Sequence, residues 1–302
     1  MNAAERIVLI VRREAARRPS HVRMLKFFEG VFLKIEETRG QALPAVVSPS
    51  EEIERLHARG RALLSPADLL RRNEKEIRLL LADLLARAAE EGEEWAYGAL
   101  RKVRSGQLGT DDLVRLLEGE ALSPGLGETA ADAALLARFV RYALGPFAMR
   151  AAEVLRARLP RRGRVHAPPG GGWTGESSLY QPVGRSCPVC GHPPALALLR
   201  GGLDGRFLAC GLCGTEWETD RLGCVHCGGL DPGANRILDV EGEEAFRLDV
   251  CERCRGYIRT VVVEKLDRPL YVPLEGVLML HLDLVAEREG YHAGAMTPAE
   301  GV

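Results

Sequence analysis

The sequence predicts an α+β protein in which an N-terminal helical bundle is followed by two tandem zinc-ribbon modules and a C-terminal helix. Apolar residues recur at three- and four-residue steps in the first half, all eight cysteines fall in four Cys-x-x-Cys pairs in the second, and apolar runs of strand length separate these pairs. The expected organisation is a helical domain (1–160), a linker (161–186), a first four-cysteine module (187–222), and a second module with the C-terminal helix (223–302).

The first 160 residues are rich in Ala, Leu, Arg and Glu, which favours helices. One buried helix face is predicted to carry Leu25, Phe28, Val31, Phe32 and Ile35. Ser65 before Pro66 predicts the start of a helix that continues through Leu85, and Thr110 is expected to cap another. Gly145-Pro146 should break or kink a long helix between Glu128 and Leu159.

The stretch 161–186 is rich in Gly, Pro and Ser, which is typical of a linker. A phosphate-binding role for Gly170–Gly172 is the alternative. No strand precedes these glycines and no Gly-Lys-Ser/Thr follows them, which argues against that role.

The four cysteine pairs indicate two metal sites. Two residues between cysteines let both sulfurs face one ion, and two such turns supply four thiolates. In sequence order the spacings are C-x2-C-x19-C-x2-C and C-x2-C-x23-C-x2-C, close to those of zinc ribbons. The expected ligands are Cys187, Cys190, Cys210 and Cys213 in the first site and Cys224, Cys227, Cys251 and Cys254 in the second.

Glycines support this interpretation because the turn after the second cysteine needs a positive φ. Gly191, Gly214 and Gly228 follow three of the pairs directly, whereas Arg255 follows the fourth. Disulfides and redox-active dithiols are the alternatives. The chain lacks a secretory signal pattern, and no βαβ unit surrounds the pairs, so both are disfavoured.

Between the cysteine pairs, strands are expected at 195–199, 206–209, 236–240, 247–250 and 257–263, and a helix at about 274–289. Each ribbon is too short to bury a stabilising core. Metal binding must therefore supply its folding free energy, on the order of 10 kcal/mol per structural site.

Charge and hydropathy exclude some functions. The chain has 41 basic and 42 acidic residues, but from Cys187 onward it has 11 Lys and Arg against 18 Asp and Glu, net −7. An acidic cysteine-rich half repels phosphates, so no nucleic acid partner is expected. No segment reaches the ~18 apolar residues of a membrane span, so we expect no membrane insertion and a cytoplasmic location, where thiols stay reduced.

We expect no enzymatic activity. Four cysteines close a metal shell, whereas catalytic zinc keeps an open position, and no cysteine is left over as a nucleophile. His226 lies inside the third pair and His192 follows the first. Both are expected beside the metal shells rather than in them.

The cysteine-rich half resembles the formate dehydrogenase accessory family of FdhE type. The resemblance covers residues 180–292 and rests on Cys187-Pro-Val-Cys190-Gly, Cys210-Gly-Leu-Cys213, Thr215-Glu216-Trp217 with Arg221, Cys224-Val-His-Cys227, Cys251-Glu-Arg-Cys254 with Tyr257, and a tail with Glu289-Gly290-Tyr291. Two positions depart from the family pattern: Arg255 stands where the family tends to have glycine, and Met296-Thr-Pro298 replaces the family ending.

The resemblance implies a cytoplasmic maturation factor that binds the catalytic subunit of a molybdenum- or tungsten-dependent formate dehydrogenase. It also implies that the two modules are rubredoxin-like, with zinc or iron as the metal; four-thiolate tetrahedra accept either.

A partner surface is predicted on the connection between the modules. Its residues are Thr215, Glu216, Trp217 and Arg221, with Tyr257 nearby. Trp, Tyr and Arg are residue types that dominate binding energy when they are buried at an interface. The alternative is that Trp217 packs between the ribbons as a core residue.

Two other classes remain open alongside the accessory protein. A nucleic-acid-binding zinc-ribbon protein would bind DNA or RNA at physiological salt, which the acidic half disfavours. A rubredoxin-like electron carrier would change its visible absorbance reversibly on reduction, but would not need a large helical domain.

The cysteine arithmetic predicts close to two metal ions per chain. Elemental analysis of protein purified without oxygen, with titration of free thiols, measures this. Fewer than one ion per chain together with oxidised cysteines would contradict the two-site interpretation.

Overall fold

The structure, a computed structural model, describes residues 1–42, 53, 55–56, 61–120, 129–158, 186–201 and 205–293. Two compact units are distinguished. One comprises Met1–Ile10, Ser48–Leu63 and Arg156–Val302, and the other Val11–Val47 and Leu64–Leu155. Met1–Ile10 therefore belongs to the same unit as the cysteine-rich region, while the domain limits expected from the sequence stay a prediction. Of the expected linker, only Ser186 lies within the described residues.

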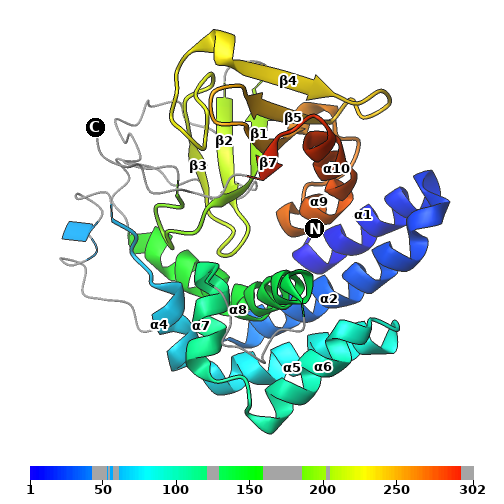
Figure 1. Cartoon of the computed structure of the whole chain (residues 1–302), viewed down its shortest axis with the longest axis vertical. Helices are drawn as coiled ribbons and strands as arrows, with labels where there is room; N and C mark the ends of the chain where they lie inside the picture. The colour runs from blue at the N-terminus through cyan, green and yellow to red at the C-terminus, as the bar shows by residue number, and fades with distance from the viewer. Residues whose placement is uncertain are drawn as a thin grey trace. The chain divides into compact units, whose positions relative to one another are not determined.

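The second of these units is helical, as predicted (Figure 1). α1 and α8 have residues in both units, and a short 3-10 turn precedes α2. The bounds are α1 (Ala3–Arg17), η1 (Pro19–His21), α2 (Val22–Gln41), α4 (Pro66–Arg72), α5 (Glu74–Glu90), α6 (Glu94–Ser105), α7 (Thr110–Glu118) and α8 (Ala130–Arg158).

Local sequence explains where several of these helices begin and end. The Ser65 hydroxyl accepts a hydrogen bond from the Asp68 N–H (3.2 Å) at the start of α4, as an N-cap should. The single helix expected from Ser65 to Leu85 is divided at Asn73 into α4 and α5. Gly109 rather than Thr110 is the N-cap of α7, and the Asp112 carboxylate accepts the Gly109 N–H (2.9 Å). α8 continues through Pro146.

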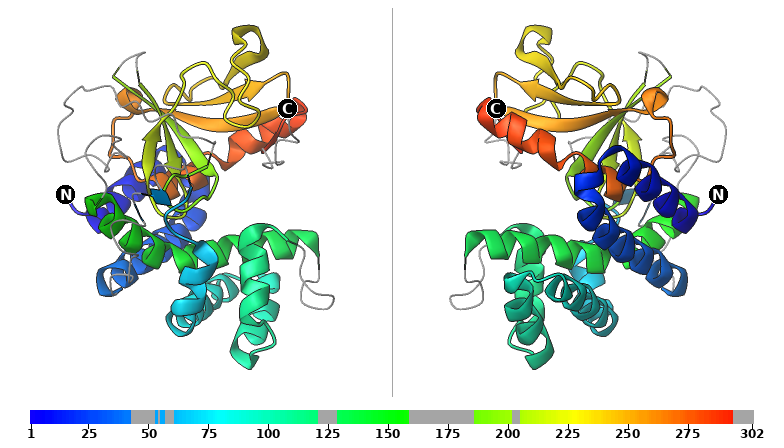
Figure 2. Two further views of the ribbon diagram at one scale, coloured as in Figure 1. Left: turned by 90° about the vertical axis from the view of Figure 1, so that its left-hand side faces the viewer. Right: turned by 90° about the vertical axis from the view of Figure 1, so that its right-hand side faces the viewer.

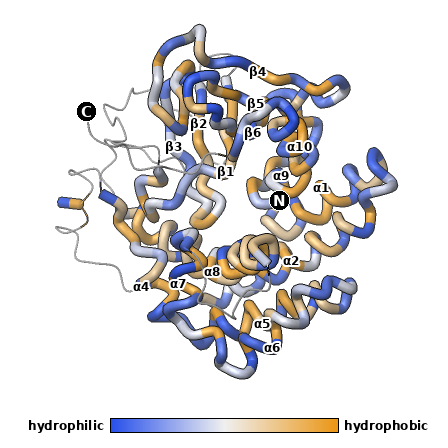
Figure 3. The backbone as a smooth tube through the Cα atoms, viewed as in Figure 1, coloured by the Kyte–Doolittle hydropathy of each residue, from blue (hydrophilic) through white to orange (hydrophobic). Residues whose placement is uncertain are grey.

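The helical unit has an apolar interior lined by aromatic rings. On α2, the predicted face residues Leu25, Val31, Phe32 and Ile35 are buried, and Phe28 is half-buried. Phe32 packs edge-to-face on Tyr142 of α8, with ring centroids 5.5 Å apart. The apolar residues of both helices appear orange in Figure 3.

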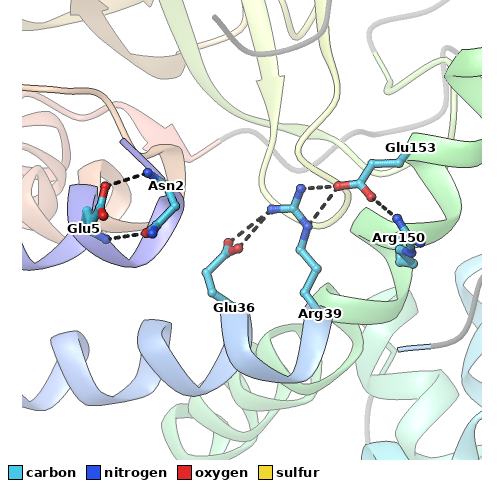
Figure 4. Close-up of polar contacts among 6 residues, drawn as sticks. All are labelled: Asn2, Glu5, Glu36, Arg39, Arg150 and Glu153. Atoms are coloured by element: carbon cyan, nitrogen blue, oxygen red, sulfur yellow. Dashed lines mark hydrogen bonds and ion pairs between the residues drawn. The ribbon is translucent and has the colours of Figure 1, made fainter. Parts of the chain in front are cut away.

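Polar side chains also connect α2 to α8. Arg39 donates to Glu36 (3.0 Å) and to Glu153 (3.0 Å), and Arg150 donates to Glu153 (2.9 Å), as Figure 4 shows. Burial raises the pKa of Glu153, but the hydrogen bonds and charges of Arg39 and Arg150 outweigh this effect and lower the pKa overall. Elsewhere in Figure 4, Asn2 and Glu5 form reciprocal hydrogen bonds at the start of α1.

The cysteine-rich unit contains one mixed sheet with the order β3-β2-β1-β6-β5-β4, and β7 pairs with β6 (Figure 1). Neighbours are antiparallel, except that β1–β6 and β6–β7 are parallel. The five expected strands are present; β3 and β7 were not foreseen. The bounds are β1 (Pro194–Arg200), β2 (Gly205–Cys210), β3 (Glu216–Glu218), β4 (Asn235–Asp239), β5 (Phe246–Cys251), β6 (Gly256–Val262) and β7 (His292–Ala293).

The two cysteine modules share this sheet. β1, β2 and β3 come from the first module, and β4, β5 and β6 from the second. The parallel contact between β1 and β6, which aligns Ala197 with Thr260 and Leu199 with Val262, joins them. The modules are tandem in sequence, but their strands form one structural layer.

Two short helices cover one face of the sheet, as both views in Figure 2 show. The single C-terminal helix expected at 274–289 is divided at Met279 into α9 (Val272–Leu278) and α10 (Leu280–Arg288). Met279, Leu282 and Ala286 pack on apolar side chains of alternate strand positions, among them Leu198, Phe207, Leu248, Val250 and Val261. Short 3-10 turns lie at Pro232–Ala234 and Val263–Lys265.

A fully buried ion pair fixes the entry into α9. Arg268 donates two hydrogen bonds to Glu275, at 2.6 and 2.8 Å, and both side chains have no exposed surface. Arg268 also lies 5.9 Å from the centroid of the Phe246 ring in the core. Removal of one partner would leave a buried, uncompensated charge.

None of the helices in the described ranges combines the length and the hydropathy that a membrane span requires.

Glu275→Ala is predicted to destabilise the cysteine-rich unit by about 3–5 kcal/mol, because Arg268 remains charged in an apolar site. Urea denaturation measures the change. Glu287→Ala on the exposed side of α10 is the control and should change stability by less than about 0.5 kcal/mol. Arg268→Met combined with Glu275→Leu should restore most of the loss; if Glu275→Ala costs less than the control, the pair has no structural role.

Candidate metal centres

The first cysteine cluster is closed. The Sγ atoms of Cys187, Cys190, Cys210 and Cys213 all lie within 4.8 Å of one another, and each side chain is at most 2% exposed. Two of the sulfur–sulfur distances, Cys187–Cys213 and Cys190–Cys210, are 3.5 Å. The turn after the first pair is attached to the chain before α4, since Leu63 N–H donates to the Val189 carbonyl (2.8 Å).

The second cluster is partly open. Its sulfurs also lie within 4.8 Å of one another, with Cys224–Cys254 at 3.7 Å and Cys227–Cys251 at 3.8 Å. Cys224 and Cys251 are buried, but Cys227 and Cys254 are half-buried. The eight cysteines thus form the two sequential groups of four expected from their spacing.

The separations fit a metal site. A tetrahedron with metal–sulfur bonds of about 2.3 Å has sulfur–sulfur edges of about 3.8 Å, whereas a disulfide would need about 2.05 Å. All eight cysteines are free. The donor set is therefore suited to one zinc or iron ion per cluster.

The turns have the backbone form that such sites require. The N–H groups of Gly191, Gly214 and Gly228 donate to the carbonyls of Cys187, Cys210 and Cys224, at 2.8, 3.1 and 2.9 Å. These glycines have φ of 73°, 65° and 69°, the left-handed conformation predicted for them. N–H groups also approach the sulfurs, such as Cys227 N–H to Cys224 Sγ at 3.4 Å.

Arg255 takes the same left-handed conformation, with φ of 56°, although it has a side chain. Its guanidinium donates to the carbonyl of Glu289 (2.6 Å) and lies 3.9 Å above the ring of Tyr291. Its own carbonyl accepts the His292 N–H (2.9 Å) at the start of β7. These contacts offset the backbone cost and join the fourth turn to the segment after α10.

Burial and hydrogen bonds among the thiols shift the pKa values of three cysteines in the first cluster. Hydrogen bonding with Cys187 and the other thiols, together with burial, raises the pKa of Cys190 well above its usual value; burial likewise raises that of Cys210. Burial raises the pKa of Cys213, but hydrogen bonds with the other three thiols and Thr215 outweigh burial and lower this pKa well below its usual value. Burial and mutual hydrogen bonding thus oppose ionisation of Cys190 and Cys210, and a divalent cation would stabilise their thiolates.

An arginine supports this cluster from outside its shell. The Thr215 hydroxyl lies 3.1 Å from Cys213 Sγ and accepts a hydrogen bond from Arg156 (3.2 Å). A hydroxyl that accepts from a cation can donate to a thiolate, which orients the ligand. No local sequence pattern predicts this role for Arg156, which lies near the end of a long helix, because the contact spans 59 positions.

The residues predicted to contact a partner do not share one environment. Thr215 lies beside the first cluster. Glu216 is buried and accepts two hydrogen bonds from Arg200, at 2.5 and 3.2 Å. Trp217 is 2% exposed and Tyr257 is buried, whereas Arg221 is exposed. Their role in partner binding stays a prediction, and the burial of Trp217 supports the alternative of a core residue.

Neither nearby histidine belongs to a cysteine cluster. His226 Nε2 lies 2.8 Å from the Tyr257 carbonyl and so donates to β6. His192 offers its backbone carbonyl to the Cys187 N–H (2.8 Å). Within the described part of the chain, the groups arranged to hold a metal are the two sets of four thiols.

Fold and site together define a class: a protein with a helical unit and a mixed sheet that carries two four-cysteine metal-binding clusters. The family profile "FdhE, central domain" matches residues 186–221. A protein named FdhE homolog from Pseudomonas aeruginosa is 33% identical over 124 residues, which cover 38% of this chain and 40% of that protein. Protein FdhE from Escherichia coli is 31% identical over 115 residues, 37% of this chain and 36% of the relative. The alignments thus span about two fifths of these relatives' length.

A solved structure extends the likeness to the whole chain. The crystal structure of the FdhE protein from Pseudomonas aeruginosa has a TM-score of 0.64 over 99% of this chain and 95% of that chain, at 20% identity, and so shares the fold. The profile and the relatives confirm the resemblance of the cysteine-rich half to FdhE proteins that its cysteine motifs predict, and the crystal structure shows that the fold is shared.

The two clusters are predicted to release metal at different rates. A thiolate-reactive reporter with a chelator should remove the ion of the second cluster first, because Cys227 and Cys254 are half-buried while the first cluster is closed. Release kinetics of the protein and of Cys254→Ser measure this. The variant should lose the fast phase and retain the slow one; a single phase for both ions in the wild type would contradict the asymmetry.

Proposed function

We propose that the protein is an accessory factor that binds the catalytic subunit of a molybdenum- or tungsten-dependent formate dehydrogenase and is needed for its assembly or activity. The observation that carries this proposal is the pair of four-thiol clusters on one sheet, in a chain whose fold matches an FdhE structure over 99% of its length.

The geometry suits recognition rather than catalysis. Each cluster uses four cysteines of one set, which leaves no coordination position for a substrate, and the first cluster is buried. When bound, each metal ion would hold its two cysteine turns in place. It would have no open coordination position at which to act as a Lewis acid. The clusters fix the ends of β2 and β5, which gives a rigid surface and lowers the ordering cost of binding a partner.

The metal sites argue against the two alternative functions, an electron carrier and a nucleic-acid-binding protein. An electron carrier needs a cluster close to its surface; the first cluster, at 1–2% exposure, does not meet that requirement, so only the second, with Cys227 and Cys254 half-buried, could serve in this way. For nucleic acid, two loaded clusters would add a charge of about −2 each to a region that is already acidic.

Deletion of the gene is predicted to reduce formate dehydrogenase activity at least tenfold while the catalytic subunit is still made. Activity staining and immunoblotting of the same cells measure the two quantities, and a second molybdenum enzyme serves as the control for cofactor supply. Restoration by the wild type but not by Cys187→Ser would support a role for the first cluster. Normal formate dehydrogenase activity in the deletion strain would contradict the proposal.

A further inference from the structure

A cavity of about 270 Å³ lies beside the second cysteine cluster, on the sheet face opposite α9 and α10. Strand alternation establishes the face: Leu248 of β5 packs in the core beneath those helices, whereas its neighbours Arg247 and Asp249 line the cavity. Cys224 and Cys251 of the cluster also contribute to its wall.

The rim of the cavity is apolar and exposed. Leu222 is 58% exposed, Ile237 48%, and Leu230, which packs near Gly223, 64%. Asn235 of β4 is connected to the segment at Leu222 across the mouth of the cavity, since its side-chain amide donates to the Leu222 carbonyl (2.5 Å). Clustered large apolar side chains at a concave surface are typical of binding sites.

The rim also includes an edge strand. β4 ends the strand order, so among the described strands none pairs with its outer edge (Figure 1). An exposed strand edge can add an extended segment of another chain through main-chain hydrogen bonds.

The lining of the cavity contains more guanidinium groups than carboxylates, although Arg206 also donates to the backbone carbonyl of Gly223 (2.8 Å). Arg206 donates to Asp249 (3.0 Å), and Arg247 approaches the same carboxylate (3.0 Å), so two guanidinium groups share one acid. Arg206 is 4% exposed, and its Nε is buried without a hydrogen-bond acceptor within the described residues. Arg221 at the mouth is exposed and forms no ion pair with any described residue.

Metal in the second cluster offsets part of this positive charge. Four thiolates around a divalent ion carry about −2, and Arg206 and Cys224 both line the cavity. The backbone N–H groups of His226 and Cys227 donate to Cys224 Sγ and so stabilise negative charge on this sulfur. Arg221 remains for an external anion.

We propose that this surface, formed by the cavity, its rim (Arg221, Leu222, Leu230, Ile237) and the outer edge of β4, binds an extended segment of the partner that carries a large apolar side chain next to a carboxylate. The apolar side chain enters the cavity, and the carboxylate pairs with Arg221. The volume suits one or two side chains and is too small for a dinucleotide or a pterin cofactor. The inference rests on the proposed function, because the partner is the formate dehydrogenase catalytic subunit.

The test captures that subunit on tagged full-length protein when both are produced in the same cells. Arg221→Glu and Ile237→Asp each change one rim side chain. Arg288→Glu and Leu284→Asp are matched controls, since both residues are exposed on α10, away from the cavity. Metal content of every variant verifies the clusters. The rim variants should retain two ions and capture at least tenfold less subunit, while the controls match the wild type.

The outcomes separate the surface from the proposed function. If the wild type captures no subunit, the proposed function fails. If it captures the subunit and both rim variants bind like the controls, the surface is wrong. A concentration-dependent dimer that only the rim variants abolish would overturn the proposal in favour of a second copy of this chain.

A photo-crosslinker at Leu222 identifies the occupant. The crosslinked segment should contain a large apolar residue within two positions of Asp or Glu, and replacement of that acid by Lys should restore capture by Arg221→Glu. A crosslinked segment that is basic would overturn the charge assignment.

Discussion

Eight thiols in two groups of four impose the main constraint on this protein. Neutral thiols would leave each group of sulfurs crowded and weakly bonded, and thiolates without a cation would repel one another at 3.5–3.8 Å. The sheet depends on how this constraint is met, because β2 ends at Cys210, β5 ends at Cys251 and β6 begins two residues after Cys254. A metal ion in each cluster would fix these strand ends, and the β1–β6 pairing would then combine the two halves into one layer.

The two clusters differ in what surrounds them. The first is enclosed and supported by the Arg156–Thr215 hydrogen bond, which suits a structural role. The second has two half-buried ligands and lies beside a cavity with an apolar rim. Equivalent motifs in sequence therefore serve different purposes in the fold: one stabilises, and the other also shapes a surface for recognition.

Buried charges are kept where they fix a connection between elements. Arg268–Glu275 holds the start of α9 against the core, and Arg200–Glu216 joins β1 to the segment after the second cysteine pair. Arg206–Asp249 connects β2 with β5 across the shared sheet. Each contact is made at a cost in desolvation, which full hydrogen bonding of the ion pair largely offsets. The Arg206–Asp249 pair is the exception, because Arg206 Nε and Asp249 Oδ1 are buried without a hydrogen-bond partner within the described residues; both residues line the cavity.

The sequence by itself determined the helical first half, the grouping of cysteines into two sets, the positive-φ turns and five of the strands. These features depend on local spacing: two residues between ligands, glycine after a pair, and alternating apolar residues. Only the tertiary structure decided that both modules share one sheet, that Thr215, Glu216 and Trp217 are buried, and that a cavity lies beside the second cluster. Those outcomes arise from contacts across distant positions, such as Ala197 with Thr260 or Arg206 with Asp249, which no local pattern specifies. Whether a motif is buried depends on which distant segments pack over it. The spacing of residues within the motif does not specify those segments.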